Sequence, residues 1–176
     1  MKKRLGFVSN SSSSSFIIMF DKEPESVEEI KEMLFDFDSV SYYDYTISSE
    51  QASEIIFRDI EKIEEKVLRE EFDNMIYEIK YGTEQWLIDR NDSDLKDFIS
   101  LDEKHWKNWE EWKELSEKIE LLREKVIDKM NKKFALESEG KFVYHVVFSD
   151  NDGDIYCTLE HGEVFRKVKH IRINNH

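Results

Sequence analysis

The sequence predicts an α+β fold, with a small antiparallel sheet formed by the two chain ends and a long α-helical hairpin inserted between them. Three observations lead to this prediction. Residues 16–20 form a short apolar run near the start of the chain. Residues 142–148, near its end, follow the two-residue period of a strand. Between these segments, apolar residues recur at intervals of three and four, which is typical of amphipathic helices.

The expected strands lie close to the two ends of the chain. Because each is too short to be stable alone, we expect residues 16–20 and 142–148 to pair in one sheet. An acidic turn at 149–154, with Asp-Gly chemistry, predicts that residues 155–159 return as a second strand of a hairpin. Residues 171–173 are a further candidate strand.

Three helices are expected between the strands. Ser26, with Glu29 three residues later, predicts a capped helix that ends near residue 37, and residues 38–48 then form a loop or a marginal strand. Ser49 begins a long helix that ends at Gly82, and its length of about 30 residues corresponds to roughly 45 Å. The next long helix begins near Asp102 and carries an apolar stripe at Leu115, Ile119, Leu122, Val126, Met130 and Phe134.

We therefore predict a single domain, residues 1–176, in two parts. Residues 1–20 and 141–176 make the β unit, and residues 21–140 make the helical insertion, whose two long helices pack as an antiparallel hairpin.

The composition is that of a folded, soluble protein. Charged residues make up 38% of the chain, but 23 aromatic residues provide packing surfaces that disordered chains lack. The single cysteine, Cys157, excludes an internal disulfide and indicates a reducing compartment. No apolar stretch approaches the ~20 residues of a membrane span, and the serine tract interrupts the start of the chain before an apolar core of a signal peptide could form. We expect a cytoplasmic protein without a membrane partner.

The net charge of −14 is unevenly distributed. Residues 1–20 carry three bases and no acid, and residues 141–176 carry five of each, so residues 21–140 carry −17. This balance argues against nucleic acid as a partner and favours a protein with a basic surface. The acidic helices could also imitate a phosphate array.

Strings at both ends carry a resemblance. The segment 4–16 reads Arg-Leu-Gly-Phe-Val-Ser-Asn followed by five serines and Phe, and the end contains Phe-Ser-Asp-Asn-Asp-Gly at 148–153 and Leu-Glu-His-Gly at 159–162, followed by Phe165, His170 and His176. These strings resemble small uncharacterised bacterial and phage proteins. The resemblance covers the two ends only, and it implies a phage or mobile-element setting without an activity.

Polar residues of the two ends make one candidate site. The serines and basic side chains could bind a phosphate, although the tract lacks the glycines of a phosphate-binding loop and also fits a flexible linker or a processing site. Imidazoles near carboxylates could serve acid–base or metal chemistry, but the histidines do not have the spacing of a known metal-ligand motif. A calcium-binding EF-hand loop starting at Asp150 would need glycine and glutamate at the positions of Ile155 and His161, so this motif is excluded. The expected binding residues are Arg4, Ser11, Ser12, Ser13, His161, Arg166, His170, Arg172 and His176.

The helical insertion supplies the other candidate surface. Tryptophans spaced by three residues lie on one helix face and pack in the core or, if exposed, bind a partner. Acidic residues of the preceding helix extend this surface. The expected partner-surface residues are Trp106, Trp109, Trp112, Glu64, Glu65, Glu70 and Glu71.

Two functions follow from these features. The first is a non-enzymatic acidic interaction protein that binds a basic host protein through its helical hairpin, without a cofactor or metal. The alternative is a site for a phosphorylated small molecule, either nucleotide binding or metal-dependent hydrolysis, which requires that the two chain ends meet in space. Whether the protein is an enzyme is left open by the sequence.

Overall fold

A computed structural model describes residues 13–80, 86–105 and 112–175. It confirms the α+β class. The chain divides into two units, of which unit 1 comprises Met1–Ile63 and Gly140–His176, and unit 2 comprises Glu64–Glu139. Residues 21–63, which we assigned to the helical insertion, therefore belong with the chain ends. Each unit is described by itself.

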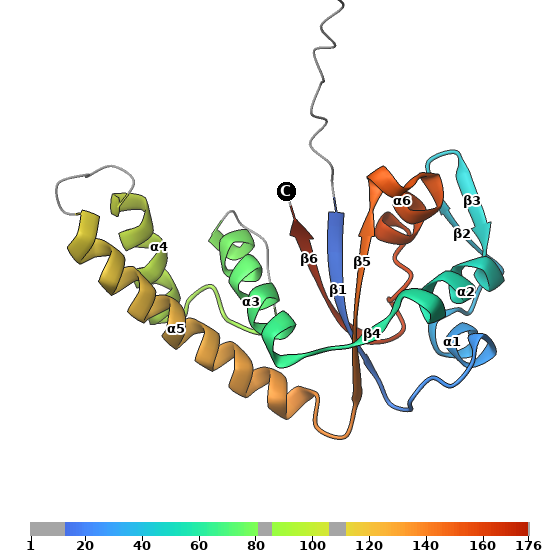
Figure 1. The fold of residues 1–176 in the computed structure, drawn as a ribbon, viewed down its shortest axis with the longest axis horizontal. Coiled ribbons are helices and arrows are strands. Elements are labelled where there is room, and N and C mark those ends of the chain that lie inside the picture. Colours follow the sequence, from blue (N-terminus) through green and yellow to red (C-terminus); the bar gives the residue numbers. More distant parts are fainter. Residues whose placement is uncertain (1–12, 81–85, 106–111, 176) are drawn as a thin grey trace, which may run out of the picture. The chain divides into compact units, whose positions relative to one another are not determined.

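Unit 1 contains a four-stranded sheet in the order β4 (Glu61–Lys62), β5 (Phe142–Ser149), β1 (Ser13–Phe20) and β6 (Lys169–Asn175). The central strand β1 is antiparallel to both of its neighbours (Figure 1). Phe16 of β1 lies opposite Val146 in β5 and Arg172 in β6. The prediction that the two ends of the chain form one sheet is thus confirmed.

The central position of β1 follows from its composition. Every residue from Ser14 to Phe20 is buried, on both faces of the strand. An uninterrupted apolar run is typical of a strand that has no solvent-exposed face. By contrast, burial in β5 alternates from Tyr144 to Phe148.

One face of this sheet is covered by α1 (Val27–Leu34), α2 (Ser49–Asp59), the hairpin of β2 (Ser39–Tyr42) and β3 (Tyr45–Ser48), and α6 (Asp154–His161) (Figure 1). The β2–β3 hairpin forms where we expected a loop or a marginal strand. Buried side chains of the sheet and of this layer form one apolar core, which includes Phe16, Ile18, Phe20, Ile30, Leu34, Val40, Ile56, Phe148, Leu159 and Phe165.

The helices of unit 1 begin at capping residues. Ser26 caps α1, and its hydroxyl accepts a hydrogen bond from the backbone N–H of Glu29 at 3.3 Å, as the sequence predicts. Ser48 and Gln51 form a reciprocal capping box at the start of α2. The cap of α2 is therefore Ser48, one residue before the predicted cap. Ser49 is the first residue of the helix and is buried.

The segment 154–161 is a helix, so the prediction of a strand at 155–159 is wrong. A short 3₁₀ helix, η1 (Asp150–Asp152), follows β5, and Gly153, with a φ of 103°, separates it from α6. Ile155 and Leu159 lie four residues apart and pack together against the core from one helical face. A run of five mostly apolar residues fits the period of a strand as well as that of a helix, and packing on the sheet selects the helix here.

Gly162, which ends α6, allows the close approach of α6 to β2. A Cβ atom at this position would overlap the side chain of Val40 and the carbonyl oxygen of Thr158. We expect Gly162→Ala to lower the free energy of unfolding by about 1–3 kcal/mol, because a packed region must shift to admit the methyl group. Urea unfolding measures the loss.

Gly140→Ala is the matched control for this substitution. Gly140 has a φ of 71° but no atom within 4 Å of an added Cβ, so its replacement costs only the backbone strain, roughly 1–2 kcal/mol. A Gly162→Ala variant as stable as the wild type would contradict this account of the α6–β2 contact.

The long helix predicted from Ser49 to Gly82 is also broken. The backbone becomes extended at Ile60, and Glu61 and Lys62 pair as β4 with β5 opposite His145 and Tyr144. Helical periodicity continues across this break in the sequence. Pairing with the sheet edge overrides this helical periodicity. The pattern around residue 60 gives no sign of it, because the partner strand is about 80 residues away in the sequence.

Unit 2 consists of α3 (Glu65–Lys80), α4 (Ser93–His105) and α5 (Trp112–Glu137), and α5 packs against both of the other helices. Within the described residues of unit 2, three helices therefore stand where we predicted two long ones. Asp102, expected to begin the second long helix, lies inside α4, where its carboxylate accepts a 2.5 Å hydrogen bond from Lys80. Lys129 of α5 binds Asp92 at 2.6 Å and Asp94 at 2.7 Å.

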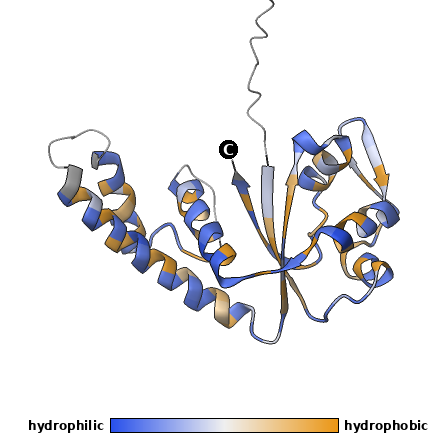
Figure 2. Ribbon diagram, viewed as in Figure 1, coloured by the Kyte–Doolittle hydropathy of each residue, from blue (hydrophilic) through white to orange (hydrophobic). Residues whose placement is uncertain are grey.

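The apolar stripe predicted for the second long helix packs only in part. Val126, Met130 and Phe134 are buried, whereas Leu115 and Ile119 are half-buried. Colouring by hydropathy shows polar and apolar residues along all of α5, as expected of a helix with one buried stripe (Figure 2). No helix in the described part of the chain has both the length and the apolar character that crossing a membrane requires.

Candidate functional site

Side chains from both ends of the chain meet in unit 1 around Arg172. On the face of the sheet that carries Phe16, β1 presents Ser14 and β6 presents Arg172 and Asn174. The Arg172 guanidinium donates to the Ser14 hydroxyl from Nε at 3.2 Å and from Nη2 at 3.1 Å. Arg172 also lies over the ring of Phe16, 5.7 Å from its centroid.

A buried carboxylate completes this group. The Glu160 side chain, from the last turn of α6, has no exposed surface, and its Oε1 atom accepts a hydrogen bond from the Ser14 hydroxyl at 2.8 Å. The same hydroxyl lies 3.0 Å from the amide oxygen of Asn174, and its one hydrogen can serve only one of these two acceptors. Nη2 of Arg172 is 3.7 Å from Oε1 of Glu160.

His161 connects this group to the β2–β3 hairpin. Its Nδ1 atom is 3.4 Å from Nη2 of Arg172, and its Nε2 atom is 3.8 Å from Oε2 of Glu160. The imidazole ring stacks on Tyr42, with centroids 4.5 Å apart and planes inclined by 22°. We call Ser14, Glu160, His161 and Arg172 the terminal network.

A cavity of about 230 Å³ lies beside the terminal network. Its apolar walls include Phe16 and Phe165, and Arg166 and His170 also line it. Arg166 forms a 2.6 Å ion pair with Asp36 and lies over the Phe37 ring. The ring of His170 lies against Phe16 and Phe165, and its Nδ1 atom is 3.1 Å from the carbonyl oxygen of Val168.

The charges around this cavity are balanced. Its lining contains the two arginines, Arg166 and Arg172, and two glutamates, Glu160 and Glu163. A phosphate would therefore meet as many carboxylates as guanidinium groups. The terminal network has the features of a structural brace, in which a buried carboxylate is matched by a cation and a hydroxyl.

The structure places the other predicted binding residues as follows. Ser13 begins β1 opposite Ser149 and Asn175, and Ser14 and Ser15 are fully buried, so this part of the serine tract is strand rather than linker. The remaining predicted residues of this site lie outside the described residues, namely Arg4, Ser11, Ser12 and His176.

The predicted partner surface on unit 2 is described only in part. Trp106 and Trp109 lie outside the described residues, and so does the side chain of Trp112 at the start of α5. Residues Glu64, Glu65 and Glu70 are exposed.

Glu71 does not belong to this surface. It is only 7% exposed, because it lies beside Phe72 on the packed side of α3. Residues 64–139 contain 22 acidic and 14 basic side chains, a net charge of −8. More than half of the acidic excess of residues 21–140 is therefore in residues 21–63, on unit 1.

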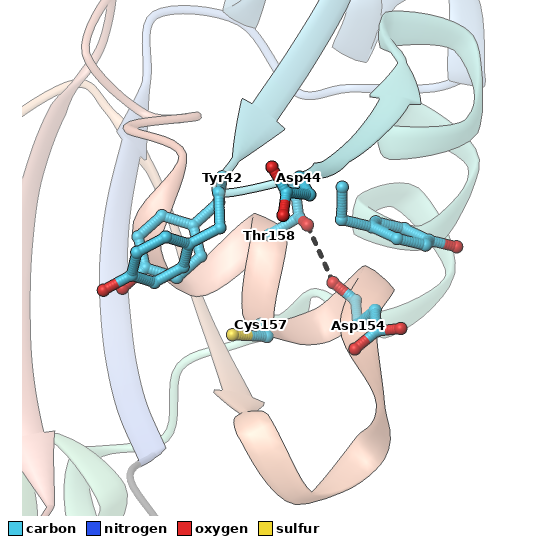
Figure 3. A pocket seen from close by; sticks show the side chains of 7 residues that line it. Tyr42, Asp44, Asp154, Cys157 and Thr158 are labelled. Carbon is cyan, nitrogen blue, oxygen red and sulfur yellow. Dashed lines mark hydrogen bonds between the residues drawn. The ribbon is translucent and has the colours of Figure 1, made fainter.

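A second cavity lies between the β2–β3 turn and α6. Its volume is about 280 Å³, and we call it the tyrosine cleft, lined by Tyr42, Tyr43, Asp44, Tyr45, Asp154, Cys157 and Thr158. Tyr42 and Asp44 reach it from the turn, and Asp154, Cys157 and Thr158 from the helix (Figure 3). Thr158 donates a 2.7 Å hydrogen bond to the carbonyl oxygen of Asp154.

Cys157 does not have the environment of a nucleophile. Partial burial, followed by the negative charges of Glu160, Asp150 and Asp154, raises the pKa of the Cys157 thiol. A raised pKa keeps the sulfur protonated near neutral pH, and the thiolate is the reactive form. Carboxylates near α6 therefore act on this thiol, although burial is the larger cause of the shift.

Sequence reasoning missed several residues of these two sites. Glu160 stands in the Leu-Glu-His-Gly string that we noted, but only the fold shows that it is buried beside Ser14. Residues 42–45, Tyr-Tyr-Asp-Tyr, lie within a segment expected to be a loop or a marginal strand, and this concentration of three tyrosines around an aspartate was the available signal for the cleft.

Comparison with known proteins adds no functional information. No protein-family model matches the chain, and neither a curated protein nor a solved structure is detectably similar to it. Among the described residues, no three histidine, cysteine, aspartate or glutamate side chains gather into a group that could hold a metal ion. The function is therefore argued from the geometry of unit 1.

Proposed function

We propose that this protein is a non-enzymatic binding protein that recognises a basic protein partner through an acidic surface. The observation that carries the proposal is a group of four aspartates at and next to the tyrosine cleft, which we call the acidic rim. Asp44 and Asp154 line the cleft, and Asp150 and Asp152 belong to η1, which directly precedes α6. All four side chains are exposed. Opposite charges steer association and fix the orientation of partners more than they add affinity, so the rim suits a surface that selects for basic groups.

The surroundings of the rim support this proposal. Asp44 and Asp154 line one cleft, and Asp150 and Asp154 both act on the Cys157 thiol, so the carboxylates share one region of unit 1. No lysine, arginine or histidine of the described residues lines the cleft. A basic partner would therefore meet carboxylates that are not already neutralised within the cleft.

The proposed setting is a reducing cytoplasm, in keeping with the free Cys157. The resemblance of the chain ends to bacterial and phage proteins favours a host protein as the partner. Unit 2 carries exposed glutamates of its own, Glu64 just before α3 and Glu65 and Glu70 within it.

Neutralising the rim should weaken binding to a basic probe. We expect the variant in which all four rim aspartates become asparagine to bind a short oligolysine peptide about tenfold more weakly than the wild type at low salt. Wild-type affinity should also fall steeply as salt is raised, because the Debye length is only about 10 Å at 0.1 M. Isothermal titration calorimetry measures both effects.

A variant with the same charge serves as the control. Replacing Glu64, Glu65 and Glu70 with glutamine and Asp128 with asparagine removes four exposed carboxylates from unit 2 and leaves the rim intact. An equal loss of affinity in the two variants would contradict the assignment to the rim. Absence of oligolysine binding to the wild type at low salt would contradict the proposed function itself.

A second candidate function is favoured by one observation, the convergence of Ser14, His161 and Arg172 beside a cavity. Under this alternative, the cavity would hold a phosphorylated small molecule through charge-assisted hydrogen bonds. A thermal-shift screen with phosphate and nucleotides tests it, since a bound ligand stabilises by about 2.7 kcal/mol at a hundredfold excess over Kd. Lys169→Ala is the control for Arg172→Ala, because Lys169 points to the opposite face of the same strand.

A further inference from the structure

We propose that the tyrosine cleft receives one organic cation, the ammonium or guanidinium end of a lysine or arginine side chain of the basic partner. This inference rests on the proposed function and names the group that the acidic surface recognises. It is carried by the lining of the cleft, which combines three aromatic rings with two carboxylates.

The chemistry of the lining suits a cation and disfavours an anion. The face of an aromatic ring is electronegative and attracts a cation within about 6 Å of its centroid. Asp44 and Asp154 add two carboxylates to the same cavity, and no basic residue of the described chain is among its lining residues. The aromatic walls bind the apolar stem of a long side chain, while the carboxylates face its charged end.

Tyr42, which forms one wall of the cleft, is held in place by two neighbouring rings. The Tyr42 ring stacks on His161, with centroids 4.5 Å apart, and makes a T-shaped contact with Tyr43, also at 4.5 Å between centroids. A hydrogen bond with Tyr43 raises the pKa of the Tyr42 hydroxyl, so this phenol stays neutral near physiological pH. A rigid ring loses little conformational entropy when a ligand binds.

Tyr43 occupies a turn position that rarely holds an aromatic residue. Its φ is 49°, in the left-handed region that glycine and asparagine enter most easily. Its side chain is 88% exposed, so its contact with Tyr42 leaves most of the residue open to a ligand. A strained, exposed aromatic residue at the mouth of a cavity is accounted for if the ring contacts a ligand.

Carboxylates also act on a residue inside the cleft. Cys157 lines the cleft, and carboxylates around it, Asp154 among them, raise its pKa after the larger effect of burial. The geometry and the charge thus favour the same class of ligand.

Tyr43→Asn provides a direct test. Asparagine tolerates a positive φ, so this change removes the ring without adding strain, and we expect the thermal stability to be unchanged or slightly raised. Affinity for a short oligolysine or oligoarginine peptide should fall about tenfold, whereas Tyr43→Phe, which keeps the ring, should stay within about twofold of the wild type. Tyr77→Ala removes a half-exposed tyrosine from α3 and should bind like the wild type.

Competition separates the cleft from general charge attraction. At equal ionic strength, tetramethylammonium chloride should displace the peptide more effectively than sodium chloride, because aromatic rings bind quaternary ammonium groups. Equal displacement by the two salts, or wild-type affinity of Tyr43→Asn, would overturn the inference. If Tyr43→Asn binds normally while the rim variant does not, the proposed function stands and only the inference about the cleft fails. If wild-type protein does not bind the peptide at low salt, both fail.

Discussion

Phe148→Ala should lower the free energy of unfolding by about 3–5 kcal/mol, the usual cost of truncating a fully buried phenylalanine. Phe148 is 0% exposed and lies at the centre of the aromatic cluster between the sheet and its covering layer. Its ring stacks on Phe165 at 6.2 Å and also meets Phe16 at 5.7 Å and Tyr156 at 6.1 Å. A cavity at this position removes contacts to β1, to α6 and to the turn that leads into β6.

Urea unfolding followed by far-ultraviolet circular dichroism measures this loss. Val147→Ala is the matched control, because Val147 is the preceding residue of β5, points to the other face and is 47% exposed. Its replacement should cost no more than about 1 kcal/mol, within the range of strand propensities. Equal losses for Phe148→Ala and Val147→Ala would show that the aromatic cluster is not the main core of unit 1.

Arg172→Met should destabilise the protein by about 2–3 kcal/mol. Removing one partner of a buried ion pair costs about 3–5 kcal/mol, because the other charge stays buried without compensation. We expect a smaller value here, since the Arg172 side chain is 36% exposed whereas Glu160 has no exposed surface. The loss should change little with salt, because buried charges are screened much less than exposed ones.

A double-mutant cycle tests whether the terminal network acts as a unit. Glu160→Gln removes the charge but keeps an oxygen that can accept from the Ser14 hydroxyl. The double variant should therefore be more stable than the sum of the single losses predicts, with a coupling of about 1–2 kcal/mol. Lys169→Met, on the opposite face of β6, should be nearly neutral.

The same cycle separates the two candidate functions. Strong coupling between Arg172 and Glu160 identifies the guanidinium as part of the brace that joins β1, β6 and α6. If the two losses are instead additive and Arg172→Met leaves stability unchanged, the arginine is available for a ligand. That outcome, together with a thermal shift by phosphate that Arg172→Met abolishes, would favour the phosphate site over the acidic rim.

Local signals in the sequence determined several parts of the fold. The uninterrupted apolar run at 16–20 predicts a buried strand, and the alternation at 142–148 predicts its partner, because segments this short must pair to be stable. The cap at Ser26 predicts the start of α1, since a serine hydroxyl satisfies a backbone N–H that the helix leaves unpaired. These features depend on neighbouring residues, so they can be read from a short window of sequence.

Other features were decided only by the tertiary structure. The period of residues 155–159 fits a strand or a helix, and packing of Leu159 on the sheet selects the helix. Ile60 to Ile63 continue a helical stripe, yet pairing of β4 with β5 makes them extended. Ser14, Glu160 and Arg172 meet across separations of 146 and 158 residues, and the tyrosine cleft joins a turn at 42–45 to a helix at 154–161. No local pattern records such distances, because these contacts form only when the two ends of the chain share one sheet.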